Sequence, residues 1–128
     1  MTQDTPAELL RARLRRDLRD AMKAQRQDEM AALRTLIGAI DNAESVEESP
    51  TTRTPTPSEH VAGALRGLGV TDAVRRQLSE RELQRIIENE LWERDAQAER
   101  LTLLGHADDA SRLRVEADVI ARYQMPQD

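Results

Sequence analysis

The sequence contains no cysteine and no phenylalanine, and its only aromatic residues are Trp92 and Tyr123. Without cysteine, the chain has no disulfide bond, no thiolate metal site and no cysteine nucleophile. Its two histidines, His60 and His106, belong to no cluster with the spacing of metal ligands, and neither glycine-rich phosphate-binding motif is present. We therefore expect no metal site, no cofactor and no catalytic residue.

The sequence also lacks a long hydrophobic run. Nothing in it approaches the roughly 18 consecutive apolar residues of a membrane-spanning helix, and its first residues have neither the basic nor the apolar region of a secretory signal. We therefore expect no membrane association and a cytoplasmic location. Leu, Ile and Val together make up only about one-fifth of the chain, which favours alanine-rich helix packing over a thick sheet-based core.

Hydrophobic residues recur at helical spacing in the amino-terminal third. A capping-box pattern at residues 5–8, with proline at the first helical position, predicts a helix over about 6–25. Asp28 is the predicted N-cap of a second helix that ends near Ser45, and the short connection predicts an antiparallel hairpin. The predicted apolar stripes are Leu10, Leu14, Leu18 and Met22 in the first helix, and Met30, Leu33, Leu36, Ile37 and Ile40 in the second.

The carboxyl-terminal third predicts a second pair of helices. Another capping-box pattern, at residues 79–82, begins a helix over 80–104, and Gly105 marks its end. A last helix follows over about 108–123. The apolar positions of these two helices are Leu83, Ile86, Ile87, Leu91, Ala98 and Leu101, then Leu113, Ala117 and Ile120.

The stretch between the two pairs predicts a connection. Residues 46–56 are rich in proline and threonine and predict a flexible linker, and residues 57–78 predict a short helical insert. No segment alternates between apolar and polar residues with period two. The predicted fold is all-α, with two antiparallel helical hairpins packed as a small bundle in one domain over residues 1–126.

Charge is unevenly distributed along the chain, whose net charge is −5. Residues 7–26 contain seven basic and three acidic side chains, whereas residues 88–128 contain five basic and ten acidic ones. In the first predicted helix, a basic residue directly follows each member of the apolar stripe, which gives a ribbon of Arg11, Arg15, Arg19 and Lys23. This ribbon is a candidate contact for an RNA phosphate backbone. The alternative is a solvated flank whose long side chains cover the core.

A second apolar face is predicted on the helix over 80–104. Trp92 and Leu103 lie on the side of this helix opposite Leu83. This face is either packed under the predicted insert or exposed as a docking patch for a partner. The many carboxylates of the same helix have no apolar walls around them, so we expect most of them to be solvated rather than catalytic.

Two features of the second predicted helix have explanations that need no ligand. Gly38 costs about 1 kcal/mol relative to alanine inside a helix, and close packing between helices explains it. Asp41, Asn42 and Glu44 offer oxygen ligands, but they lack the spacing and the glycine of a calcium-binding loop.

The order and spacing of several short motifs resemble the YqeY-like family. The first part of the pattern consists of residues 17–23, Leu33-Arg34 and residues 39–44, and residues 59–69 look like the insert of actinobacterial members. The resemblance covers nearly the whole chain. Its second part consists of Leu83, Glu90, Arg94, Gly105, Glu116 and Tyr123.

The resemblance implies a helical domain similar to the C-terminal region of GatB, a subunit of glutamine-dependent tRNA amidotransferase. The implied role is a non-catalytic accessory module that binds tRNA or the amidotransferase. One alternative is a component with carbon–nitrogen ligase activity that uses glutamine as amide donor, although no catalytic residue of the family maps onto this sequence. A second alternative is a self-associating or protein-interaction module. We expect the family's smaller tail domain to be absent, since residues 123–126 only imitate the Tyr-Leu-Pro element that precedes it.

Overall fold

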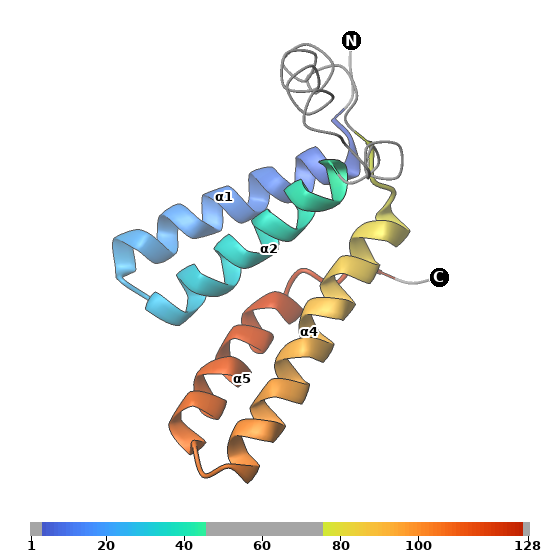
Figure 1. Ribbon diagram of the computed structural model, residues 1–128. Helices are drawn as coiled ribbons and strands as arrows, with labels where there is room; N and C mark the ends of the chain where they lie inside the picture. Colours follow the sequence, from blue (N-terminus) through green and yellow to red (C-terminus); the bar gives the residue numbers. More distant parts are fainter. Residues whose placement is uncertain (1–3, 46–75, 127–128) are drawn as a thin grey trace, which may run out of the picture.

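The computed structural model describes residues 4–45 and 76–126, and every regular element within these ranges is an α-helix (Figure 1). The first two helices form one antiparallel hairpin and the last two form another, which confirms the predicted all-α fold of packed hairpins. In chain order, the helices are α1 (Pro6–Ala24), α2 (Gln27–Ser45), α4 (Glu80–Leu103) and α5 (Ala107–Ala121).

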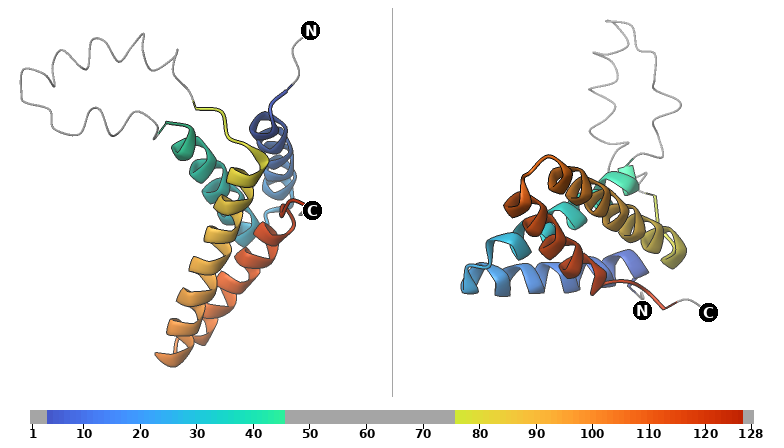
Figure 2. Two further views of the ribbon diagram at one scale, coloured as in Figure 1. Left: turned by 90° about the vertical axis from the view of Figure 1, so that its right-hand side faces the viewer. Right: turned by 90° about the horizontal axis from the view of Figure 1, so that it is seen from below.

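The two hairpins cross obliquely, and α2 is the helix that joins them (Figure 2). It packs along α1 within its own hairpin, and against α5 and α4 of the other hairpin. Contact between α1 and α4 is slight. The end of the second hairpin that carries the α4–α5 turn extends away from the first hairpin (Figures 1 and 2). At that end, α4 packs against α5 and not against the first hairpin.

Local capping determines where the helices begin. Thr5 accepts a hydrogen bond from the Glu8 backbone N–H, and the Glu8 carboxylate accepts one from the Thr5 N–H, which confirms the first capping box. Ser79 and Glu82 repeat this arrangement at α4. The predicted N-cap at Asp28 is wrong, because α2 begins one residue earlier and Asp28 lies in its first turn, where a carboxylate favours the helix dipole.

The apolar stripe of α1 turns away from the core toward the end of the helix. Leu10 and Leu14 are buried, whereas Leu18 is only partly buried and Met22 is 48% exposed. Residues four apart drift by about 40° per step around a helix with 3.6 residues per turn. Ala21, which is seven residues after Leu14, therefore replaces Met22 in the core.

The buried face of α2 is rotated relative to the predicted stripe, since Ala32 and Glu44, which lie outside that stripe, are buried. Leu33, Leu36 and Ile40 are fully buried, whereas Met30 and Ile37 lie partly exposed at the edge of the core. Because α2 packs against three other helices, its buried surface is centred between the two hairpins rather than on α1 alone.

The second hairpin follows its predicted stripes more closely. The predicted positions that are buried are Leu83, Ile87, Ala98, Ala117 and Ile120, and those that are partly buried are Ile86, Leu91, Leu101 and Leu113. Gly105, with φ of +87°, follows the end of α4 as predicted; this left-handed conformation suits glycine.

The predicted linker over 46–56 and most of the predicted insert over 57–78 lie outside the described residues. The last three residues of that insert are described, and they are not helical. Leu78 is nevertheless buried in the core directly before α4. Within the described residues, no helix is long and apolar enough to cross a membrane.

Gly38 does not lie at a close helix contact, which corrects the prediction from the sequence. A methyl group built on its Cα would meet no atom within 4 Å, and the residue is exposed on α2. Close packing therefore does not require this glycine, and its conformational freedom in the unfolded chain is a net cost to stability.

Replacing Gly38 with alanine should stabilise the protein by about 0.5–1 kcal/mol, because alanine has the better helix propensity and meets no neighbour here. Urea denaturation followed by circular dichroism measures the change. Ala31, which is exposed on the same helix, provides the matched control, since Ala31→Gly should destabilise by a similar amount. A Gly38→Ala variant that is less stable than the wild type would contradict the open surroundings of this residue.

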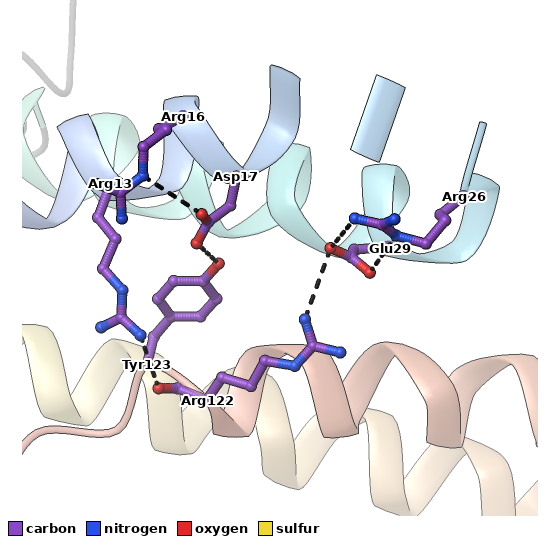
Figure 3. Close-up of polar contacts among 7 residues, drawn as sticks. All are labelled: Arg13, Arg16, Asp17, Arg26, Glu29, Arg122 and Tyr123. Carbon is purple, nitrogen blue, oxygen red and sulfur yellow. Dashed lines mark hydrogen bonds and ion pairs between the residues drawn. The ribbon is translucent and has the colours of Figure 1, made fainter. Parts of the chain in front are cut away.

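A polar contact around Tyr123 holds the carboxyl-terminal segment against α1 (Figure 3). The buried Tyr123 donates its hydroxyl to Asp17 Oδ2 at 2.5 Å, and the Arg13 guanidinium lies 4.5 Å from the centre of the Tyr123 ring. Farther along, the Met125 backbone N–H donates to Gln84 Oε1 at 2.6 Å. Burial, and then the hydrogen bond to Asp17, raise the pKa of Tyr123 above its ordinary value.

Tyr123→Phe should destabilise the protein by about 1–2 kcal/mol at neutral pH, because the hydrogen bond to Asp17 is lost. The raised pKa means that the folded state favours the protonated phenol. This stability is fully present below the unfolded-state pKa of about 10 and is lost as pH rises above it. The difference between wild type and variant, measured by urea denaturation, should therefore shrink above pH of about 10.

Tyr123 is the only tyrosine in the chain, so tyrosinate absorbance reports its ionisation directly. Asp17→Asn should lower the pKa of Tyr123, since the carboxylate contributes to the shift both by hydrogen bonding and by its charge. Ionisation of the folded wild type at the ordinary pH of a free tyrosine would show that this contact does not form.

Candidate functional site

The outward side of α1 carries exposed basic residues. Arg15, Arg19 and Lys23 are spaced four residues apart on the side away from the buried Leu14, so they lie in a row along the helix. None of the three has an ion-pair partner within residues 4–45 and 76–126. Their charge is thus available to a ligand.

Arg11 does not belong to this row, and the predicted ribbon is corrected at this position. Its side chain is buried between α1 and α2, where Nη2 lies 3.0 Å from Asp41 Oδ1 and 2.5 Å from Glu44 Oε1. The same Asp41 oxygen accepts a hydrogen bond from Arg11 Nε at 3.1 Å. Arg11 faces the neighbouring helix, whose two carboxylates neutralise it.

The Arg11–Asp41 contact fixes the register of the first hairpin and brings α2 into the basic surface. Because α1 and α2 are antiparallel, moving four or eight residues forward from Arg11 corresponds to moving a similar distance back from Asp41. Counted from the Arg11–Asp41 contact, this register places Arg19 level with Leu33, which directly precedes Arg34. Arg34 is exposed and has no ion-pair partner in the described part of the chain. We refer to Arg15, Arg19, Lys23 and Arg34 as the basic face.

A second buried arginine joins α4 to α5. Arg94 Nη1 lies 2.7 Å from Glu90 Oε1, and Arg94 Nε lies 3.1 Å from Glu116 Oε1. All three side chains are largely buried, and no buried side-chain nitrogen or oxygen among the described residues lacks a hydrogen-bond partner. These residues, which the sequence singles out only through the family pattern, form a satisfied contact between helices.

Most of the remaining carboxylates of α4 are exposed, as predicted from the amphipathic pattern. Glu88, Glu93, Asp95 and Glu99 all lie on the solvent side. Asp41 and Glu44, the ligands considered for a metal, instead hold Arg11. Within the described ranges, no three histidine or acidic side chains gather as metal ligands would.

Trp92 and Leu103 are exposed among the described residues, and the predicted insert, which is the other alternative for covering them, lies almost entirely outside those residues. Trp92 is 69% exposed and Leu103 is 82% exposed. Eleven residues separate them, which is three helical turns, so they lie on the same side of α4 and about 16 Å apart along its axis. No described segment covers them.

A shallow depression lies at the turn between α4 and α5. It is open and polar, and it is lined by Gly105, His106, Ala107, Asp108, Asp109 and Arg112. His106 is the N-cap residue of α5, but its side chain makes no capping hydrogen bond. An exposed imidazole beside exposed carboxylates has neither the burial nor the oriented partner that general acid–base catalysis uses.

Comparisons with protein-family models, with curated proteins and with solved structures find no match to this chain.

Arg11→Met should destabilise the protein by roughly 3 kcal/mol, because it removes the cation between two carboxylates, of which that of Glu44 is buried. Arg15→Met, one turn along the same helix, should change the free energy of unfolding by less than about 0.5 kcal/mol. Urea denaturation of both variants measures this contrast. Equal effects of the two substitutions would mean that Arg11 is as solvated as Arg15.

Proposed function

We propose that this protein is a non-catalytic helical module that binds a structured RNA through its basic face. The proposal is supported by four basic side chains whose charges are available to a ligand. They are exposed and have no ion-pair partner in the described part of the chain: Arg15, Arg19, Lys23 and Arg34. Arg11 and Arg94, by contrast, hold helices together and are neutralised by carboxylates. The proposal agrees with the tRNA-associated accessory role that the resemblance to the YqeY-like family implies.

The spacing of the basic face suits a chain of phosphates. Successive members on α1 lie about 6 Å apart along the helix axis, and arginine, which accounts for three of the four residues, forms paired hydrogen bonds to phosphate oxygens. Each phosphate neutralised in this way releases condensed counterions, which gives favourable free energy at low salt. Gly38 leaves the α2 backbone bare at an exposed position, so an RNA strand can approach that helix closely there.

The absence of aromatic side chains from this face indicates which kind of RNA it suits. Proteins that bind single strands stack the bases on aromatic rings. Here Trp92 lies on α4 and Tyr123 is buried, so neither belongs to the basic face. We therefore expect contacts with the backbone of a folded RNA, of which tRNA is the form that the family resemblance suggests.

Acidic surfaces elsewhere on the described part of the molecule disfavour RNA. The chain has a net charge of −5, and its exposed carboxylates on α4 repel a polyanion. Binding should thus depend strongly on a few residues. No feature of the described residues specifically favours amide transfer, which the alternative of carbon–nitrogen ligase activity requires. We therefore propose binding alone.

The combined substitutions Arg15→Glu and Arg19→Glu should weaken binding of folded tRNA at least about tenfold at low salt, because two phosphate contacts become repulsive. The slope of log affinity against log salt should fall by about 2 in magnitude. Fluorescence anisotropy with labelled tRNA over a series of salt concentrations measures both quantities. Arg11 is left intact, since its loss would destabilise the hairpin.

The matched control reverses two exposed arginines on the other hairpin, Arg100→Glu and Arg114→Glu, which changes the net charge equally. This variant should lose much less affinity than the α1 variant. Equal losses in both would show that net charge alone drives association, and unchanged binding in the α1 variant would exclude the basic face as the RNA contact.

A further inference from the structure

One exposed surface has no role in the proposed RNA contact. It runs along α4 and consists of Trp92, Ala96, Glu99 and Leu103, which recur at intervals of four, three and four residues and so share one side of the helix. Trp92 and Leu103 are among the most exposed large apolar side chains of the described residues, at 69% and 82%. We call this surface the α4 outer face.

The α4 outer face is apolar at both ends and acidic between them. Glu99 lies between Ala96 and Leu103, is exposed, and has no ion-pair partner in residues 4–45 and 76–126. Asp95 and Glu88 lie on one flank; Asp95 is also unpaired within these ranges, and Glu88 accepts a hydrogen bond from Gln84. Any partner that covers the two apolar ends also covers the Glu99 carboxylate.

We propose that the α4 outer face docks a basic amphipathic helix of a different protein. Apolar side chains of that helix pack on Trp92 and Leu103, and a lysine or arginine between them pairs with Glu99. The cation is required because burying a carboxylate without a partner costs far more than the apolar contact returns. The separation of the two apolar anchors, about 16 Å, matches three turns of a helix lying alongside α4.

The arrangement of charge argues against a second copy of this chain docked symmetrically on the same face. In an antiparallel pair that places Trp92 on Leu103 of the copy, Glu99 lies opposite Ala96 of the copy. The two Glu99 carboxylates are then offset by three residues, or about 4.5 Å along the axis. Like charges at such a separation oppose association, so the acidic centre selects a basic partner.

This inference does not rest on the RNA contact, because the two surfaces belong to different hairpins and have opposite charge. An RNA or an anionic lipid surface is repelled by Glu99 of the α4 outer face and by Asp95 and Glu88 on its flank. If the wild-type chain did not bind RNA, the proposal for the α4 outer face would still stand. Likewise, if the basic peptide did not bind, the proposed RNA contact would still stand.

Trp92 is the only tryptophan in the chain, so its fluorescence reports directly on this face. The probe is a synthetic, alanine-based helical peptide without tryptophan that carries leucine at two positions three turns apart and arginine on the same side between them. Titrating this peptide into the full chain should shift Trp92 emission to the blue as the ring leaves water. Two matched peptides, one with glutamate for arginine and one with the same composition in scrambled order, should bind at least about tenfold more weakly.

Substitutions on the exposed face separate the two parts of the contact and do not disturb the core. Leu103→Ala should weaken binding of the basic peptide about tenfold by removing an anchor. Glu99→Gln should weaken it at least about threefold, and should narrow the difference between the basic and the glutamate peptides. Asp118→Asn, which removes an exposed carboxylate of α5, provides the control with equal charge change and should leave the affinity unaltered.

Three results would overturn the proposal. One is the absence of any emission shift with the basic peptide up to about 1 mM, the weakest affinity of interest. Another is equal binding of the glutamate or scrambled peptide. The third is a dimer in light scattering that Leu103→Ser converts to a monomer, since a second copy would then occupy this face.

Discussion

Burial of an arginine between two carboxylates is the interaction on which each hairpin depends. Arg11 joins α1 to Asp41 and Glu44 of α2, and Arg94 joins Glu90 to Glu116 across α4 and α5. The chain has no phenylalanine, and Leu, Ile and Val make up only about one-fifth of it, so apolar contacts alone define the packing of its helices weakly. Such pairs are costly to break once formed, because the remaining carboxylate stays desolvated. They therefore fix the register of helices whose apolar contacts alone would allow sliding.

These pairs also separate the arginines into two groups with different uses. Those directed toward a neighbouring helix meet carboxylates and contribute to the fold, whereas Arg15, Arg19 and Arg34 point to solvent and keep their charge available. The difference depends on a rotation of about 40° between Arg11 and Arg15 around α1. A basic residue at every fourth position does not by itself define a binding surface. Here the first of these residues, Arg11, pairs with carboxylates of α2.

The sequence predicts those features of the structure that depend on local interactions, and it fails for those that depend on contacts between helices. The helix limits, the two capping boxes and both hairpins are governed by contacts within a few residues, and the sequence predicts them well, although Asp28 lies inside α2 rather than at its N-cap. The rotation of each helix about its axis depends on the whole bundle. The sequence therefore misplaces Met22 and Arg11, and it attributes Gly38 to a packing contact that does not form. For the same reason, the sequence left the exposure of Trp92 open, since the helical period indicates a second apolar face but not what covers it.

The division of charge between the hairpins connects the two proposed surfaces. The basic face is built from α1 and α2, whereas the α4 outer face is acidic with apolar ends, so the two surfaces belong to different hairpins. These hairpins cross obliquely (Figure 2). A net charge of −5 conceals this separation, which is why composition alone argues against any contact with nucleic acid. Opposite charge on distinct surfaces lets each exclude the other's ligand by repulsion. The two proposed contacts are therefore compatible with each other, since neither ligand competes for the other's surface.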